Sequence, residues 1–316
     1  MLPRAPATLR PMTAVAAPPA QDMAWVPGGT FAMGDDRFYR EERPVRDVAV
    51  EGFWMDEHPV TVAEFRRFVK ATGHVTAAEL APEASDYPGA DPANIVPGSI
   101  VFRPTQGPVP LDDNKRWWAW VPGACWRRPE GPGSDTYARA RHPVVHIAHA
   151  DALAYAEWAG KALPTEAEWE RAARGGLAGA VYAWGDEPGA DKANTWQGDF
   201  PWRGHRGTSP VGTFAPNGFG LYDMTGNVWE WTTDEFDLEA AGGCCGASEP
   251  GGHIPRRVIK GGSHLCAPSY CLRYRPAARQ GEPIDSSTSH IGFRCVIRAA
   301  DSPGSGDAGS PGAPGR

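Results

Sequence analysis

Cysteine is scarce in this chain, with 6 residues among 316, and long apolar runs are lacking. No segment is apolar over the roughly 20 residues that a membrane-spanning helix needs, so we expect no membrane partner. Basic residues form no run and the formal net charge is -7, which argues against nucleic acid as a partner because phosphate binding needs clustered Lys and Arg. So few cysteines also argue against a disulfide scaffold.

The two ends of the chain are poor in large apolar residues. Residues 1–23 are broken by prolines and have no apolar block typical of a signal peptide, and residues 300–316 are rich in Gly, Ser and Pro. Neither end can offset the entropy of ordering, so we expect a disordered leader, a folded domain over residues 24–299 and a disordered tail. We expect a cytoplasmic monomer.

Glycine, proline and tryptophan are abundant instead, with 38, 32 and 13 residues. This composition favours turns and loops over long helices. Alternating apolar residues predict strands over residues 25–34 and 45–55, and residues 81–106 are predicted to be a long loop. Three tryptophans are expected to pin that loop to the body: Trp117, Trp118 and Trp120.

Three helices are predicted. The capping-box spacings Thr61–Glu64 and Thr165–Glu168 each begin a helix, and these helices end at Gly73 and Gly175. The third helix is expected over residues 151–159. Because no long helix is expected after these, the fold class is α+β, irregular and low in regular secondary structure.

The densest chemistry lies after Gly261-Gly262, where a strand is expected to end. Cys266 and Cys271 follow, five positions apart, and could be a disulfide, a metal pair or two inert core residues. Two soft thiolates suit Cu(I), and Arg273 and Arg275 would favour the thiolate forms if they lie close. From the residues alone, inert or disulfide-linked cysteines are favoured over a copper site.

A second group of polar residues lies in the Gly-interrupted segment 217–231. Asp223 and Glu230 are seven positions apart, and together with backbone carbonyls they could form the all-oxygen site that Ca²⁺ prefers. The alternative is a turn whose acids accept backbone amides, and the sequence favours neither.

Three histidines resemble a set of metal ligands: His142, His146 and His149. However, residues 142–147 alternate like a strand, which would place His149 on the opposite face from the other two. We therefore expect structural histidines. The pair Cys244-Cys245 lies in a Gly-rich segment and is expected to be incidental.

A set of motifs spread over residues 24–299 resembles one known family, the formylglycine-generating enzymes or sulfatase-modifying factors. The resemblance implies their fold, which is C-type-lectin-like. The motifs occur in family order: Pro27-Gly28-Gly29-x-Phe31-x-Met33-Gly34, His58-Pro59-Val60-Thr61, Arg141-His142-Pro143-Val144-Val145-His146, Leu163-Pro164-Thr165-Glu166-Ala167-Glu168-Trp169-Glu170, Gly226-Asn227-Val228-Trp229-Glu230-Trp231, Gly261-Gly262-Ser263 and Gly292-Phe293-Arg294-Cys295.

The pattern from Ser263 to Arg279 resembles the catalytic branch of that family and reverses the preference for inert cysteines. It implies an oxidase that converts the cysteine of an unfolded sulfatase Cys-x-Pro-x-Arg segment to formylglycine with O2 and a thiol reductant. Cys266 and Cys271 would hold Cu(I), and the substrate would add a third thiolate. The other site residues implied are Ser263 and Tyr270 near oxygen and substrate, and Trp229 in the pocket wall.

The resemblance also implies structural calcium. Its ligands would be the side chains of Asp223 and Glu230 and the carbonyls of Gly226 and Val228. A second family loop would begin at Asn194, but the acidic ligand expected in it is missing.

The chain departs from the family's usual residues in the substrate groove, at Ala267-Pro268 and at His290. Two rival functions are open. The same body could be a non-catalytic module that binds a peptide or partner, or a related oxidase that acts on another thiol, as ergothioneine-type sulfoxide synthases do.

Overall fold

The computed structural model describes residues 18–89, 91–204, 207–237 and 254–298. The predicted disordered tail and most of the predicted leader lie outside these ranges, as does Cys244-Cys245. Within them, no helix is long and apolar enough to cross a membrane.

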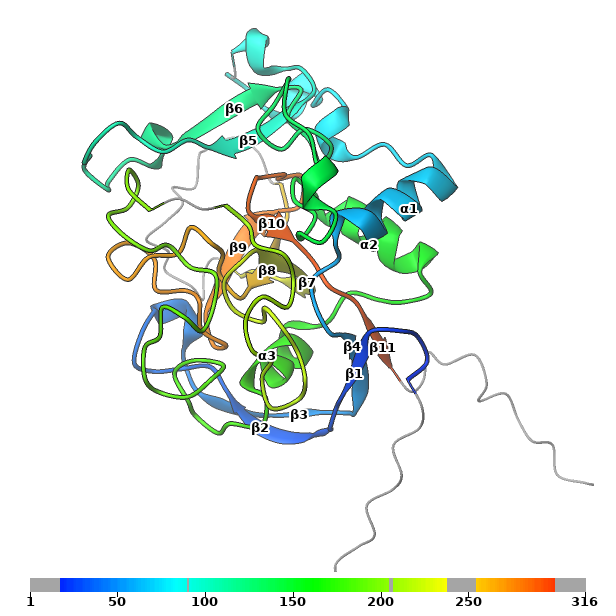
Figure 1. The fold of residues 1–316 in the computed structure, drawn as a ribbon, viewed down its shortest axis with the longest axis vertical. Coiled ribbons are helices and arrows are strands. Elements are labelled where there is room, and N and C mark those ends of the chain that lie inside the picture. The colour runs from blue at the N-terminus through cyan, green and yellow to red at the C-terminus, as the bar shows by residue number, and fades with distance from the viewer. Residues whose placement is uncertain (1–17, 90, 205–206, 238–253, 299–316) are drawn as a thin grey trace, which may run out of the picture.

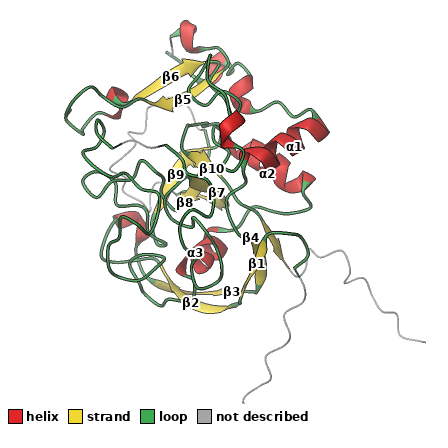
Figure 2. Ribbon diagram, viewed as in Figure 1, coloured by secondary structure: helices red, strands yellow, loops and turns green. Residues whose placement is uncertain are grey.

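Short strands joined by long loops make up most of the molecule, as predicted (Figure 2). A four-stranded sheet lies at its centre in the order β10-β7-β8-β9, in which β10 is parallel to β7 and the other pairs are antiparallel. A three-stranded sheet has the order β1-β4-β11, and β2-β3 and β5-β6 form two-stranded sheets. The strands are β1 Met23–Val26, β2 Gly29–Met33, β3 Arg46–Val50, β4 Phe53–Asp56, β5 Gly98–Phe102, β6 Trp118–Pro122, β7 Trp229–Glu235, β8 Arg256–Lys260, β9 Arg279–Pro283, β10 Ile291–Gly292 and β11 Val296–Arg298.

The helices lie on two sides of the central sheet. Figure 1 shows α1, α2 and the β5-β6 pair towards one end of the molecule, and α3 with β2 and β3 towards the other. The α-helices are α1 Val62–Thr72, α2 His149–Trp158 and α3 Glu166–Arg174, and the 3-10 helices are η1 Arg40–Glu42, η2 Ala77–Glu79, η3 Ala84–Asp86, η4 Pro92–Asn94, η5 Asn114–Arg116 and η6 Tyr137–Arg139.

The two predicted capping boxes are present. The Thr61 N–H donates to Glu64 Oε2 at 2.8 Å, and Thr165 and Glu168 repeat this arrangement at 2.7 Å. Gly73 ends α1 in the left-handed region, at φ 72°, where glycine has no steric penalty. The helix α2 begins two residues earlier than predicted, because the Asp151 carboxylate accepts the Ala148 N–H at 3.1 Å.

Three sequence predictions need correction. The expected strand over residues 45–55 is two strands of different sheets, separated at Gly52, where a Cβ atom would lie 2.4 Å from the Trp25 ring. The expected loop over residues 81–106 contains β5, which pairs with β6. The expected strand over residues 142–147 does not form, because Pro143 has no N–H to donate and His146 has φ 63°.

The central sheet brings together the two loops that carry the predicted chemistry. Glu230 near the start of β7 pairs with Lys260 at the end of β8, so the loop before β7 and the loop after β8 lie at the same end. A hydrogen bond of 2.8 Å from the Gly226 N–H to the Gly261 carbonyl joins the loops directly. Segments that are far apart in sequence thus meet at one site.

Candidate active site around two free thiols

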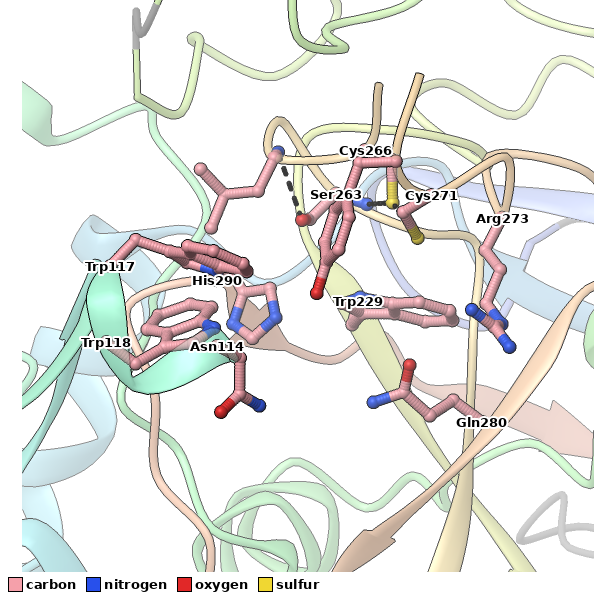
Figure 3. Close-up of a pocket in the computed structure, with 12 residues that line it drawn as sticks. Asn114, Trp117, Trp118, Trp229, Ser263, Cys266, Cys271, Arg273, Gln280 and His290 are labelled. Carbon is pink, nitrogen blue, oxygen red and sulfur yellow. Dashed lines mark hydrogen bonds between the residues drawn. The ribbon is translucent and has the colours of Figure 1, made fainter. Parts of the chain in front are cut away.

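Cys266 and Cys271 are free thiols whose sulfur atoms lie 3.3 Å apart. Cys266 is buried and Cys271 is half-buried beside a cavity of about 110 Å³. In Figure 3 both sulfur atoms lie near Ser263, on one side of the cavity. The pair is therefore close enough to share a proton, and it is not a disulfide.

The loop after β8 holds the thiols by backbone hydrogen bonds. The Ser263 N–H donates to the Cys266 sulfur at 3.4 Å, and the Cys271 N–H donates to the Ala267 carbonyl at 2.7 Å. Gly262 has φ 68°, and a Cβ atom there would lie 2.8 Å from the Arg273 carbonyl. Only glycine allows the two ends of this loop to pack so closely.

The two thiols differ in acidity. The hydrogen bond from Cys266 and the positive charge of Arg273 lower the pKa of Cys271 below the ordinary thiol value. Burial, followed by the hydrogen bond to Cys271, raises the pKa of Cys266 well above that value. At neutral pH the pair is thus a Cys271 thiolate that accepts a hydrogen bond from the Cys266 thiol.

All five residues predicted for catalysis line this cavity (Figure 3). The Ser263 hydroxyl accepts the Leu265 N–H at 3.2 Å, and Trp229 begins β7. The lining residues are Asn114, Trp117, Trp118, Trp229, Ser263, Leu265, Cys266, Tyr270, Cys271, Arg273, Gln280 and His290.

Aromatic rings form one wall of the cavity. The Tyr270 ring stacks on Phe200 with centroids 4.5 Å apart, and Trp117 meets Tyr270 edge-on at 5.4 Å. Trp118 lies 4.8 Å from the His290 ring, a pair that Figure 3 shows next to Asn114. Such a wall presents apolar surface with few polar groups, as ligand cavities commonly do.

Several lining residues were not predicted as site residues. Trp117 and Trp118 were expected only to hold a loop against the body. Trp118 also does this, because its ring centroid lies 5.6 Å from that of Phe102 in that loop. Gln280 lies at the site because β9 pairs with β8. The pairing places Gln280 opposite Ile259, which precedes the pair Gly261-Gly262 by two residues. Strand pairing was the missing signal.

The four predicted calcium ligands lie on one loop and the start of β7. Both oxygens of Glu230 accept hydrogen bonds of 2.8 Å from Arg294, and Oε2 also accepts the Trp169 indole N–H at 2.7 Å. Asp223 is buried and accepts the Gly212 N–H at 2.8 Å. Burial raises the pKa of Asp223, because the hydrogen bond from Gly212 and the charge of Arg294 offset only part of its effect. This leaves a buried carboxylate that a cation would stabilise.

The three histidines have separate partners, as expected for structural residues. His142 Nδ1 lies 2.9 Å from the Thr208 hydroxyl, and the His146 ring bonds to Ser99 at 2.7 Å and to the Pro129 carbonyl at 2.9 Å. His149 Nε2 lies 3.1 Å from the Thr232 carbonyl. In the described part of the chain, no three His, Cys, Asp or Glu side chains are grouped so as to hold a metal.

An irregular α+β body with two free thiols in an aromatic cavity defines a domain built around a dithiol centre. The chain matches, over residues 10–299, the family described as "Sulfatase-modifying factor enzyme 1-like domain". It belongs to this family, and the resemblance inferred from the motifs is confirmed.

Three relatives illustrate the range of similarity. The "Formylglycine-generating enzyme" of Mycobacterium tuberculosis is 55% identical over 290 residues, covering 86% of this chain and 96% of that protein. The "Inactive C-alpha-formylglycine-generating enzyme 2" of Bos taurus is 39% identical, covering 90% of each. The solved structure of PvdO from Pseudomonas aeruginosa has a TM-score of 0.59 at 26% identity, covering 88% of this chain and 95% of that one, which confirms the fold.

Proposed function

We propose that this protein converts the cysteine of an unfolded sulfatase Cys-x-Pro-x-Arg segment to formylglycine and so activates the sulfatase. The observation that carries the proposal is the pair of free thiols 3.3 Å apart beside an aromatic cavity. The relative from Mycobacterium tuberculosis, named for this product, supports the same reaction. A relative named inactive shares the fold, so the proposal depends on the thiols rather than on the body.

The proposed reaction is an oxidation with O2 and a thiol reductant. One substrate cysteine, one O2 and two reductant thiols give formylglycine, hydrogen sulfide, water and one disulfide. O2 takes up four electrons, two from the substrate Cβ–S unit and two from the reductant. Hydrolysis of the oxidised carbon releases the sulfur as sulfide.

The residues that line the cavity have different roles in the proposed reaction. The Cys271 thiolate, stabilised by Arg273, provides a soft, anionic sulfur donor beside the cavity. Trp229 and the stacked Tyr270 ring form walls that limit water around the reacting sulfur. The Ser263 hydroxyl lies within the same cavity, where it can donate to an oxygen atom of substrate or oxidant.

Copper is part of the proposal, and the donors present fit it. Two soft sulfur atoms lie close together, and among the described residues no His, Asp or Glu joins them as a third donor. Such a low-coordinate sulfur site suits Cu(I) and leaves a position for a substrate thiolate. When bound, Cu(I) would supply the redox centre at which O2 accepts electrons.

Calcium is proposed as a structural ion. The Asp223 and Glu230 carboxylates would hold it together with the carbonyls of Gly226 and Val228. Arg294 balances one of the two buried carboxylates, so the second is available to a cation. A cytoplasmic location and a monomeric state complete the proposal; the four described cysteines are free thiols, as a reducing compartment allows.

A peptide assay tests the function. A Cys-x-Pro-x-Arg peptide incubated with protein, Cu(I), O2 and a thiol reductant should show by mass spectrometry the loss of the thiol and the gain of an aldehyde. If the copper-loaded protein does not convert the peptide, the proposal is contradicted. If the peptide binds equally well to Cys266→Ser and is never converted, the rival peptide-binding module is the better account.

A further inference from the structure

We propose that Glu41 and Arg273 act as a positioning pair that sets the affinity of the dithiol centre for Cu(I). The inference rests on the proposed function, because it concerns the copper site of that function. It assigns a role at the thiols to a segment near the N-terminus that does not line the cavity.

Arg273 links the cavity to that segment. Its side chain lines the same cavity as Cys271, two residues away in sequence, and its positive charge acts on the Cys271 sulfur (Figure 3). Its Nη2 atom also donates to Glu41 Oε1 at 2.5 Å, across 232 positions of sequence. The guanidinium therefore lies between a carboxylate and a thiolate.

The guanidinium has little freedom to leave this position. It stacks over the Tyr39 ring at 3.9 Å, and the Tyr39 hydroxyl accepts the Leu272 N–H at 3.0 Å. The side chains of Arg273 and Glu41 are 8% and 11% exposed, so water screens their charges weakly. A fixed, poorly screened charge beside a sulfur ligand changes the stability of its anionic forms.

A second ion pair between the same two segments provides a matched control. Arg275 and Glu42 are completely buried and form a bidentate ion pair. The Arg275 Nε atom donates to the Leu272 carbonyl at 2.7 Å, and the guanidinium stacks on Phe38 at 3.8 Å. This pair connects the same segments without donating to the thiols, so it separates loop anchoring from charge at the centre.

The arrangement predicts opposite changes in Cu(I) affinity when the charge of Arg273 or of Glu41 is removed. Two thiolates with one Cu(I) carry a net charge of minus one, which the Arg273 cation stabilises. The Glu41 carboxylate offsets part of that cation. Removing the positive charge should weaken Cu(I) binding, whereas removing the negative charge with the acceptor oxygen kept should strengthen it. A role limited to folding would weaken binding in both cases.

The test is anaerobic competition for Cu(I) between the full-length protein and a chromophoric Cu(I) chelator, at one pH. We expect Arg273→Gln to bind Cu(I) about tenfold more weakly than wild type, the change that corresponds to about 1.4 kcal/mol. Arg273→Lys, which keeps the charge, should lose less. Glu41→Gln should bind about threefold more tightly, and Glu42→Gln should match wild type within about twofold.

Each outcome decides between accounts. Weaker binding by Glu41→Gln, or unchanged binding by Arg273→Gln, overturns the inference. If Arg273→Gln does not fold, the opposite signs expected for Arg273→Lys and Glu41→Gln still decide it. If wild-type protein does not bind one equivalent of Cu(I), the copper proposal itself fails, whereas normal wild-type binding with the wrong order of variants defeats only the inference.

Discussion

The Cys266 and Cys271 sulfur atoms lie 3.3 Å apart, and their surroundings move the two thiol pKa values in opposite directions. A hydrogen bond and a cation favour the Cys271 thiolate, whereas burial favours the protonated Cys266. The asymmetry gives the centre one nucleophilic sulfur, held beside the cavity, and one proton that a metal ion could replace.

Selective alkylation tests this asymmetry. Because the pKa of Cys271 is lowered, its thiolate is present at pH values below the ordinary thiol pKa of about 8.5. Iodoacetamide should modify Cys271 before Cys266 and Cys295 in the metal-free protein, and it should do so already near neutral pH. Cys266 and Cys295 should react more slowly, because burial raises their pKa values. Peptide mapping after timed quenching measures this, and modification of Cys271 only above pH 8.5 is the contrary result.

Calcium should stabilise the protein through Asp223. Burial raises the pKa of this carboxyl, so without a cation the ionised group destabilises the fold at pH values above its folded-state pKa. Asp223→Asn should therefore melt no lower than wild type in a chelator, and it should lose the increase in melting temperature that Ca²⁺ gives wild type. Asp191→Asn, a change at an exposed carboxylate, is the control. An equal calcium response in Asp223→Asn argues against the site.

Arg294 should be essential for stability. It donates to both oxygens of Glu230 and to the carbonyls of Asp56, Glu57 and Tyr222, all in a completely buried position. Arg294→Gln leaves a buried carboxylate unpaired, and we expect it to lower the free energy of unfolding by about 3–5 kcal/mol.

Urea unfolding measures this loss against a surface pair. Arg116→Gln breaks an exposed pair with Asp112 and should cost about 0–1 kcal/mol. Equal losses in the two variants contradict the assigned role of Arg294.

His290 should affect peptide binding without adding a pH dependence. Burial lowers its pKa, so the ring stays neutral as the pH rises from 6 to 9. Because the ring lies beside Trp118 in the cavity, His290→Asn should change KM for the peptide more than kcat. The pH profiles of wild type and variant should run parallel. The prediction is contradicted if the wild-type pH profile changes near the ordinary histidine pKa and this change is absent from the profile of His290→Asn.

Local signals in the sequence predicted part of this structure. The capping boxes at Thr61 and Thr165 fix helix starts because the hydrogen bonds are made within four residues. The strand predicted at 142–147 failed because His146 has a positive φ, which apolar alternation does not reveal. Contacts across the chain, such as Arg273 with Glu41, follow from packing of the whole domain and have no local signal.

The candidate site likewise combines features that local sequence signals predict with contacts between distant segments that they do not predict. Of the residues that resemble a catalytic motif, five line one cavity: Ser263, Cys266, Tyr270, Cys271 and Arg273. Of the two arginines expected to favour thiolates, Arg273 does so, while Arg275 pairs with Glu42 instead. Their spacing of two residues could not distinguish these roles, because the partners come from a distant segment.

The most direct test of the account measures aldehyde and sulfide together in one reaction. Wild-type protein and Cys125→Ser, a change at a thiol outside the cavity, should release one sulfide for each aldehyde formed on a Cys-x-Pro-x-Arg peptide, given Cu(I), O2 and a thiol reductant. Cys266→Ser and Cys271→Ser should form neither product above background. Equal yields from Cys271→Ser and wild type would contradict the central claim that the paired thiols carry out the reaction.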